Sequence, residues 1–101
     1  MRNGHHPNIE SVELPDLLHA LSDPVRLEIV RSLAEHGERC CGQFEVSVSK
    51  STLSHHLKVL RQAGVTKTRP DGTQRLLSLR EADIEARFPG LLDAILDGAR
   101  Q

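Results

Sequence analysis

The sequence predicts a mainly α-helical domain with one β-hairpin. Apolar residues recur at helical spacing in several segments, and a Pro-Asp-Gly turn separates two short runs rich in strand-forming residues. The chain has 101 residues, of which 38% are hydrophobic but only 2% aromatic, so it has room for one core built from aliphatic side chains. We expect a flexible N-terminal arm over residues 1–10 and a single domain over 11–101.

Two helices are predicted in the first third of the chain. The first covers residues 11–22 and follows an apolar stripe at helical spacing formed by Leu14, Leu17, Leu18 and Leu21. The second begins with Asp23 as N-cap and Pro24 as its first residue, and it ends near His36 because Gly37 follows. Its apolar residues surround most of the helix, so we expect it to be the central buried helix.

The middle of the chain contains an ambiguous segment and then the clearest helix. Over residues 37–50, alternation of Phe44, Val46 and Val48 is typical of a strand, whereas three-helix folds place a short helix there; we expect a short, irregular third helix. The next helix has Leu53, Leu57 and Leu60 on one face, Ser51 as its predicted N-cap and Gly64 as its terminator.

A hairpin and two short helices complete the predicted fold. Residues 65–69 and 73–79 flank the Pro-Asp-Gly turn, and residues 81–88 and 91–99 are separated by Pro89 and Gly90. Three helices, an amphipathic helix and then a hairpin is the element order of a winged helix-turn-helix.

Charge is unevenly distributed along the chain. Residues 1–49 hold four Arg and eight acids, residues 50–80 hold seven Lys or Arg and one acid, and residues 81–101 hold two Arg and five acids. The net charges are therefore −4, +6 and −3. A basic block inside an acidic chain predicts a surface that binds a polyanion, with an ordinary solvated face as the alternative.

The basic block contains the predicted DNA-binding residues. Because the leucines of the amphipathic helix must face inward, polar residues occupy its opposite face, and we expect Ser54, His55 and Lys58 to enter a major groove. The residues predicted to hold the DNA backbone are Ser51, Thr52, Arg61, Lys67, Arg69 and Arg75. His56 lies at the margin of the inward face, so we expect it to pack or form hydrogen bonds inside the protein.

Two segments also carry a family resemblance. ALSDPVRLEIVRSLAEHGERCCGQF and SKSTLSHHLKVLRQAGV resemble the ArsR/SmtB group of winged-helix transcriptional repressors, over residues 14 to about 96. The resemblance implies a homodimer formed through the first and last helices, a short inverted-repeat operator in double-stranded DNA, and release on binding a ligand or metal. The residues available for such a dimer seam are Leu14, Leu17, Leu18, Leu91, Leu92, Ile95 and Leu96. The aliphatic faces of the terminal helices support a dimer independently, although the same faces would also suit an intramolecular core.

The sequence departs from the metal sites of that family. Cys40-Cys41 replaces a Cys-x-Cys pair, and residues 81–101 contain neither His nor Cys. Adjacent thiolates can bind a metalloid such as arsenite or another thiophilic metal, but a third ligand is needed, for which His36, His5 and His6 are candidates. Redox sensing through a strained disulfide between the two, and a purely structural role, are the alternatives.

Several function classes are not expected, because the sequence motifs typical of them are absent. The chain has no phosphate-binding glycine loop, G-x-S-x-G or H-E-x-x-H motif, so we expect no enzyme activity. It has no long apolar run and no signal-peptide pattern, so we expect a cytoplasmic protein without a membrane partner. The sequence favours a dimeric, sequence-specific DNA-binding regulator that represses transcription. It leaves open a winged-helix protein-interaction module or a thiol metal-binding protein without DNA binding.

Overall fold

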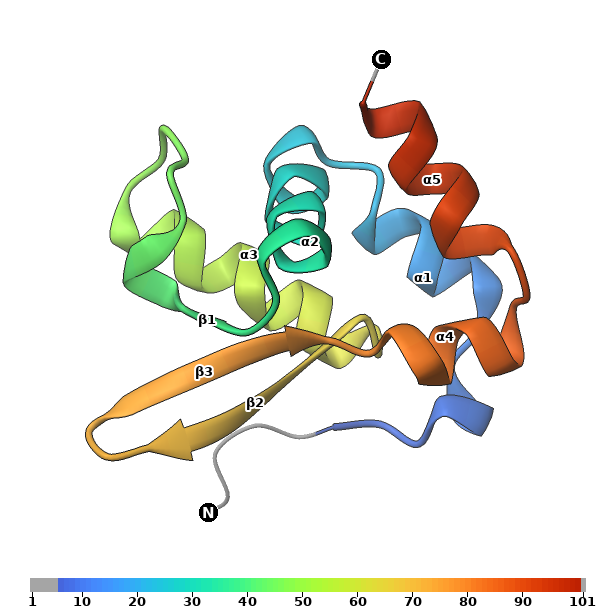
Figure 1. Cartoon of the computed structure of the whole chain (residues 1–101), viewed down its shortest axis with the longest axis horizontal. Coiled ribbons are helices and arrows are strands. Elements are labelled where there is room, and N and C mark those ends of the chain that lie inside the picture. The colour runs from blue at the N-terminus through green and yellow to red at the C-terminus, as the bar shows by residue number, and fades with distance from the viewer. Residues whose placement is uncertain (1–5, 101) are drawn as a thin grey trace.

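The computed structural model describes residues 6–100, with only the backbone of Cys41, as α-helices around a small antiparallel sheet (Figure 1). The α-helices are α1 (Leu14–Ala20), α2 (Pro24–His36), α3 (Lys50–Gln62), α4 (Glu81–Arg87) and α5 (Leu91–Ala99). The strands are β1 (Arg39–Cys40), β2 (Thr66–Asp71) and β3 (Gln74–Leu79), arranged in the order β1-β3-β2. The predicted winged helix-turn-helix is confirmed. Within the described range, none of the helices has the length and hydropathy needed to cross a bilayer.

The predicted bounds are correct for α2 but too wide for the first helix. α2 begins and ends where predicted: the Asp23 carboxylate accepts the N–H groups of Val25 and Arg26 at 2.9 and 3.1 Å, and Gly37 has a φ of 78°. The first helix is shorter than 11–22. Residues Ile9–Ser11 form a separate 3₁₀ turn, and α1 begins directly before Pro15, because proline is tolerated only in the first turn of a helix.

The segment between α2 and α3 is mostly irregular. Cys41–Gln43 form one 3₁₀ turn, which is the whole of the predicted third helix. The strand lies before it, at β1, rather than along the alternating residues 44–48; it pairs Arg39 with Leu77 and Cys40 with Leu76. β-Branched Val46 and Val48 and the nearby Gly42 have low helix propensity, which is consistent with the short turn.

The chain turns sharply from α3 into β2 at Gly64. This residue has a φ of 84°, and the N–H of Val65 bonds to the carbonyl of Leu60, as in a Schellman motif. A Cβ atom at Gly64 would lie 2.6 Å from Cγ2 of Val12, which is buried. Glycine is therefore required here both by the backbone angle and by the close approach of the N-terminal segment.

The predicted hairpin follows at once, but Pro70 and Asp71, which were expected in its turn, belong to β2. β2 and β3 pair along their full length, from Thr66 opposite Leu79 to Asp71 opposite Gln74, and Gly72 at the turn has a φ of 63°. Positive φ at the first central residue is typical of a type II′ turn, whose twist suits a hairpin. β2 is an edge strand, so the proline at position 70 interrupts no ladder.

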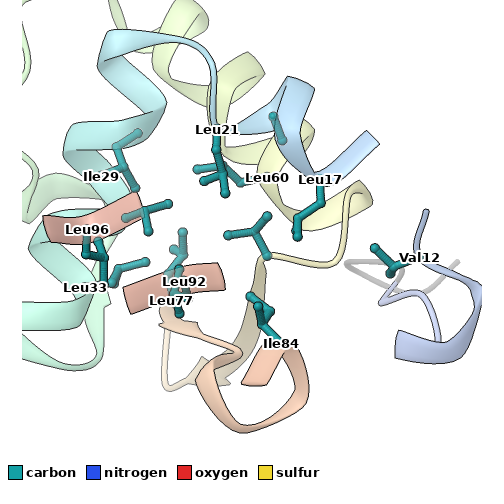
Figure 2. Packing of buried hydrophobic residues seen from close by; sticks show 13 residues of the cluster. Val12, Leu17, Leu21, Ile29, Leu33, Leu60, Leu77, Ile84, Leu92 and Leu96 are labelled. Carbon is teal, nitrogen blue, oxygen red and sulfur yellow. The ribbon is translucent and has the colours of Figure 1, made fainter. Parts of the chain in front are cut away.

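One aliphatic core joins the helices to the base of the hairpin. Figure 2 shows its side chains pointing toward one another from α1 to α5 and from β3. The fully buried members at the centre include Leu17 of α1, Ile29 of α2, Leu60 of α3 and Ile84 of α4. Because both the hairpin base and α3 contribute to this core, their relative position is fixed by packing.

Gly64→Ala should destabilise the domain by about 3 kcal/mol, because alanine opposes the left-handed backbone and its methyl group would clash with Val12. Urea unfolding followed by circular dichroism measures the effect. Gly98→Ala is the matched control: it lies in α5 with open space around it, and alanine there should add up to about 1 kcal/mol. Equal stability of the Gly64→Ala variant and the unsubstituted protein would contradict the close-approach argument.

Candidate nucleic-acid interface

α3 carries the predicted base-contacting residues and begins with a cluster of hydroxyl groups. The N-cap is Ser49, not the predicted Ser51: its Oγ accepts the N–H of Thr52 at 3.2 Å and lies 2.9 Å from the Thr52 hydroxyl. Ser51 cannot be the cap because the helix already includes Lys50. Ser51 and Thr52 remain exposed at the positive end of the helix dipole, where a phosphate is stabilised.

The outward face of α3 is polar and exposed. Leu60 is fully buried, while Ser54, His55 and Lys58 are exposed on the other side of the helix. Within the described structure, the Lys58 side chain makes no hydrogen bond or ion pair. The face therefore offers a hydroxyl, an imidazole and an ammonium group, all of which can bond to base edges or phosphates.

The inward face of α3 is fixed by a buried polar cluster. Arg26 of α2 is 8% exposed; its Nε donates to the carbonyl of Ala20 at 2.7 Å and its Nη1 lies 3.2 Å from Nδ1 of His56. Since a guanidinium can only donate, Nδ1 of His56 is the acceptor in this contact. This confirms the internal role predicted for His56. The cluster ties α3 to the ends of α1 and α2.

Asp23 completes the cluster. Its Oδ2 lies 3.8 Å from His56 Nδ1, while the same carboxylate caps α2. The pKa of Asp23 lies below its usual value, chiefly because the N–H of Arg26 bonds to the charged form, opposed by partial burial and helped by the N–H of Val25.

The hairpin carries three of the cations predicted to contact DNA, and one of them is already paired with a carboxylate. Arg69 makes a two-pronged contact with Glu38, at 2.7 and 2.8 Å, and this pairing lowers the pKa of Glu38. Lys67 and Arg75 are exposed, and neither forms an ion pair within residues 6–100. Lys67 and Arg75 are therefore directly available to phosphates, while Arg69 must exchange its carboxylate partner for one.

Two cations of α3 differ from the sequence expectation. Arg61 is half-buried, and its Nε is buried with no hydrogen-bond partner among the described atoms, so it is less accessible than predicted. Lys50, exposed in the first turn, was not among the predicted contacts. Its membership of the basic block was the signal that could have identified it.

The cysteine pair is only partly described. Cys40 is half-buried in β1, and it caps the 3₁₀ turn: its sulfur accepts the N–H of Gln43, whose side-chain oxygen accepts the N–H of Cys40 at 2.9 Å. The side chain of Cys41 lies outside the described residues, as does all of His5. These contacts give Cys40 a structural role in the turn.

His36 and His6 are the other candidate ligands that the structure describes. His36 is exposed, with Nε2 3.9 Å from a Glu35 oxygen. His6 lies at the outer edge of β2, and because β3 separates β2 from β1, it is about 10 Å or more from Cys40. Among the side chains that the structure describes, no three His, Cys, Asp or Glu groups gather as a metal site requires.

The predicted dimer seam divides into buried and exposed residues. Leu17, Leu92 and Leu96 are 0 to 4% exposed within one protomer, because they fill its own core. Leu14 and Leu18 are 41% and 43% exposed, and Leu91 and Ile95 are half-buried. The set available to a partner is therefore Leu14, Leu18, Leu91 and Ile95; helical spacing alone did not separate the two groups.

A fixed helix with an exposed polar face, followed by a cationic hairpin, is the arrangement of the winged helix-turn-helix proteins that bind duplex DNA. The sequence profile of the arsR family of bacterial regulatory proteins matches residues 23–67. The chain is 42% identical over 79 residues to the uncharacterized HTH-type transcriptional regulator YceK of Bacillus subtilis, covering 75% of this chain and 79% of that protein. It is 42% identical over 69 residues to the arsenical resistance operon repressor of Staphylococcus xylosus, covering 66% and 65% of the two chains.

A solved structure agrees with these matches. The transcriptional repressor BigR from Xylella fastidiosa superposes with a TM-score of 0.61 at 36% identity, covering 74% of this chain and 85% of that one. The chain belongs to the arsR family of bacterial regulatory proteins. It is a DNA-binding transcriptional regulator and not an enzyme, nor either of the two alternatives that the sequence left open.

Asp23→Asn should leave the α2 cap in place but remove its charge, lowering the free energy of unfolding by about 1 kcal/mol at pH 7. Because the folded-state pKa of Asp23 lies below the ordinary 3.8, the advantage of the carboxylate is complete well above pH 3.8. It disappears as the pH falls through the folded-state pKa. Urea unfolding from pH 7 to pH 2.5 should therefore show that the free energies of unfolding of Asp23→Asn and the unsubstituted protein converge below about pH 4.

Asp97→Asn, exposed in α5, serves as the control and should change the stability by no more than about 0.5 kcal/mol at any pH. A constant difference between Asp23→Asn and the unsubstituted protein over the whole range would show that the Asp23 charge has no part in stability.

Proposed function

We propose that this chain represses transcription as a homodimer, with α3 of each protomer in a major groove of an inverted-repeat operator in double-stranded DNA. The observation that carries the proposal is the exposed face of Ser54, His55 and Lys58 on a helix held from behind by Arg26. Repression is supported by the relatives in S. xylosus and X. fastidiosa, both of which are named repressors.

Recognition would divide between bases and phosphates. Ser54 and His55 have short polar side chains that can bond to base edges in a major groove. Lys58, Lys67 and Arg75 are exposed cations that form no ion pair in the described structure, so they are accessible to phosphates. Ser51, Thr52, Arg61 and Arg69 belong to the same proposed interface.

Dimerisation is proposed through α1 and α5. A single α3 reads only a few base pairs, and two-fold symmetric half-sites about 34 Å apart would combine two such contacts. Leu14 and Leu18 on α1, with Leu91 and Ile95 on α5, supply the aliphatic surface that an isologous interface needs. Residues on the same pair of helices then set the separation of the two α3 helices.

Two expectations remain predictions. Release by a metalloid, a metal or an oxidant at Cys40 and Cys41 is our prediction from the sequence, and binding of a metal or metalloid there needs a third ligand. The cytoplasm is the compartment we propose, because a regulator must reach the DNA that it binds.

Lys58→Ala should weaken binding to a duplex selected from a random pool about 5- to 10-fold at 0.1 M salt, and reduce the slope of log affinity against log salt by about one. Ser54→Ala should instead reduce the preference for the selected duplex over an unrelated one, with the slope unchanged. Fluorescence anisotropy over 50–300 mM salt measures both.

Arg100→Ala provides the matched control, because this arginine lies at the end of α5 and pairs with Asp97. It should leave both quantities unchanged. An unaltered slope and affinity for Lys58→Ala would remove α3 from the proposed interface.

Leu18→Glu should convert the dimer to a monomer, because the seam would bury a carboxylate on each side without a partner. Sedimentation velocity at micromolar concentration detects the change, and circular dichroism confirms that the exposed substitution leaves the fold intact. Ala86→Glu, at an exposed position of α4, is the control and should stay dimeric. A dimeric Leu18→Glu protein would place the seam elsewhere.

A further inference from the structure

An apolar groove lies between α3 and the loop that joins β1 to it (Figure 1). The groove has a volume of about 430 Å³. Its apolar lining residues are Phe44, Val46 and Val48 of the loop and Leu53 and Leu57 of α3, all of them half-buried. Five partly exposed apolar side chains thus gather on one concave surface beside the helix proposed to read DNA.

The alternating residues 44–48 of the sequence form one wall of this groove. Phe44, Val46 and Val48 are half-buried, whereas Glu45 and Ser47 between them are exposed. Among the described residues, Phe44 packs against the buried core, but neither Val46 nor Val48 belongs to the set that does so. The two valines therefore contribute their apolar surface to the groove and not to the core.

The polar part of the lining carries a positive charge. Lys50 and Ser54 of α3 line the groove and are exposed. Within the part of the chain that the structure describes, the Lys50 ammonium makes no hydrogen bond or ion pair. None of the described lining residues is acidic, since Glu28, Glu35 and Glu45 line a separate cavity beside α2. The groove is therefore complementary to a molecule with an apolar body and one anionic group.

We propose that this groove binds a small amphipathic carboxylate, with its apolar chain against the valines and leucines and its carboxylate on Lys50. The volume of the groove lies within the range of about 300–1,000 Å³ that is usual for small-molecule sites. Most of the affinity comes from burial of the chain, because a charge contact at an exposed ammonium is weak.

A carboxylate in the groove would compete with DNA. Ser54 is a proposed base contact, and Lys50 lies in the first turn of α3 beside the exposed Ser51 and Thr52. The ligand would cover Ser54 and place a negative charge where a phosphate is expected, so the two cannot share this end of α3. This competition rests on the proposed function, whereas binding of the carboxylate does not. It supplies a route of release that does not involve the cysteine pair.

Calorimetric titration of the full chain with octanoate, in the absence of DNA, tests the site. Hexanoate should bind about 4- to 15-fold more weakly than octanoate, because each buried methylene contributes about 2- to 4-fold. Octylammonium, which has the same chain with the opposite charge, should bind about 5-fold more weakly. Lys50→Gln should abolish the preference for octanoate over octylammonium.

Val48→Asp should weaken octanoate binding about 10-fold or more, because it replaces apolar surface with a carboxylate that repels the ligand. Val48 lies outside the described core, so the variant should fold, which circular dichroism checks. Ala86→Glu is the matched control: it adds the same charge at an exposed position of α4, away from the loop (Figure 1), and should bind octanoate as the full chain does.

Fluorescence anisotropy with a duplex selected on the full chain tests the competition. Octanoate at ten times its calorimetric dissociation constant should lower the affinity for the duplex about 10-fold or more. Acetate at the same concentration controls for ionic strength and should have no effect. Octanoate at that concentration should also leave duplex binding by Val48→Asp nearly unchanged.

Each failure has a separate meaning. Absence of octanoate binding, or equal binding by Val48→Asp and the full chain, overturns the site. Equal binding of octanoate and octylammonium overturns the role of Lys50. Octanoate binding with unchanged affinity for the duplex overturns the competition. If the full chain binds no selected duplex, the proposed function fails, while the calorimetric result still decides whether the groove binds the carboxylate.

Discussion

The relative orientation of α1, α2 and α3 depends on the buried guanidinium of Arg26. It lies in the interior, bonded to the end of α1 and to His56 of α3, while its own helix begins at the Asp23 cap. A buried cation is tolerated only when its donors are satisfied, so the ends of the three helices cannot shift independently without exposing an unpaired charge. The orientation of α3 relative to α1 is therefore set by polar contacts as well as by aliphatic packing. In the proposed dimer, these are the helices that meet the partner and the DNA.

The two adjacent histidines of α3, His55 and His56, have different surroundings. Successive residues of a helix point about 100° apart, so His56 faces Arg26 while His55 faces solvent. The Asp-Pro-Val-Arg and Ser-His-His-Leu segments that carry the resemblance thus meet inside the molecule, through Arg26 and His56. Part of the motif that carries the resemblance therefore supports α3 from behind, while the neighbouring His55 is exposed.

Features with a local cause could be predicted from the sequence. The Asp23 cap and the Gly37 and Gly64 terminators each depend on a few neighbouring residues. The hairpin was also predicted, but its turn is Gly72 and Thr73 rather than Pro70, Asp71 and Gly72. The α3 cap was misplaced by two residues, because several serines compete within one turn.

Features that depend on distant contacts could not be predicted. The spacing of apolar residues predicts that one face of a helix is covered, but it does not show whether the chain's own core covers that face. Leu17, which is buried in the core, therefore could not be distinguished from Leu18, which is exposed. The bonds from Arg80 and Arg87 to carbonyl groups more than seventy residues away leave no local pattern at all.

The outer edge of β2 is protected by another long-range contact, the bond between Thr68 and His6. His6 occupies the outward N–H of Thr68, and Pro70, two residues on, has none to offer. An added strand would find few donors there, so this edge is protected against sheet extension and aggregation.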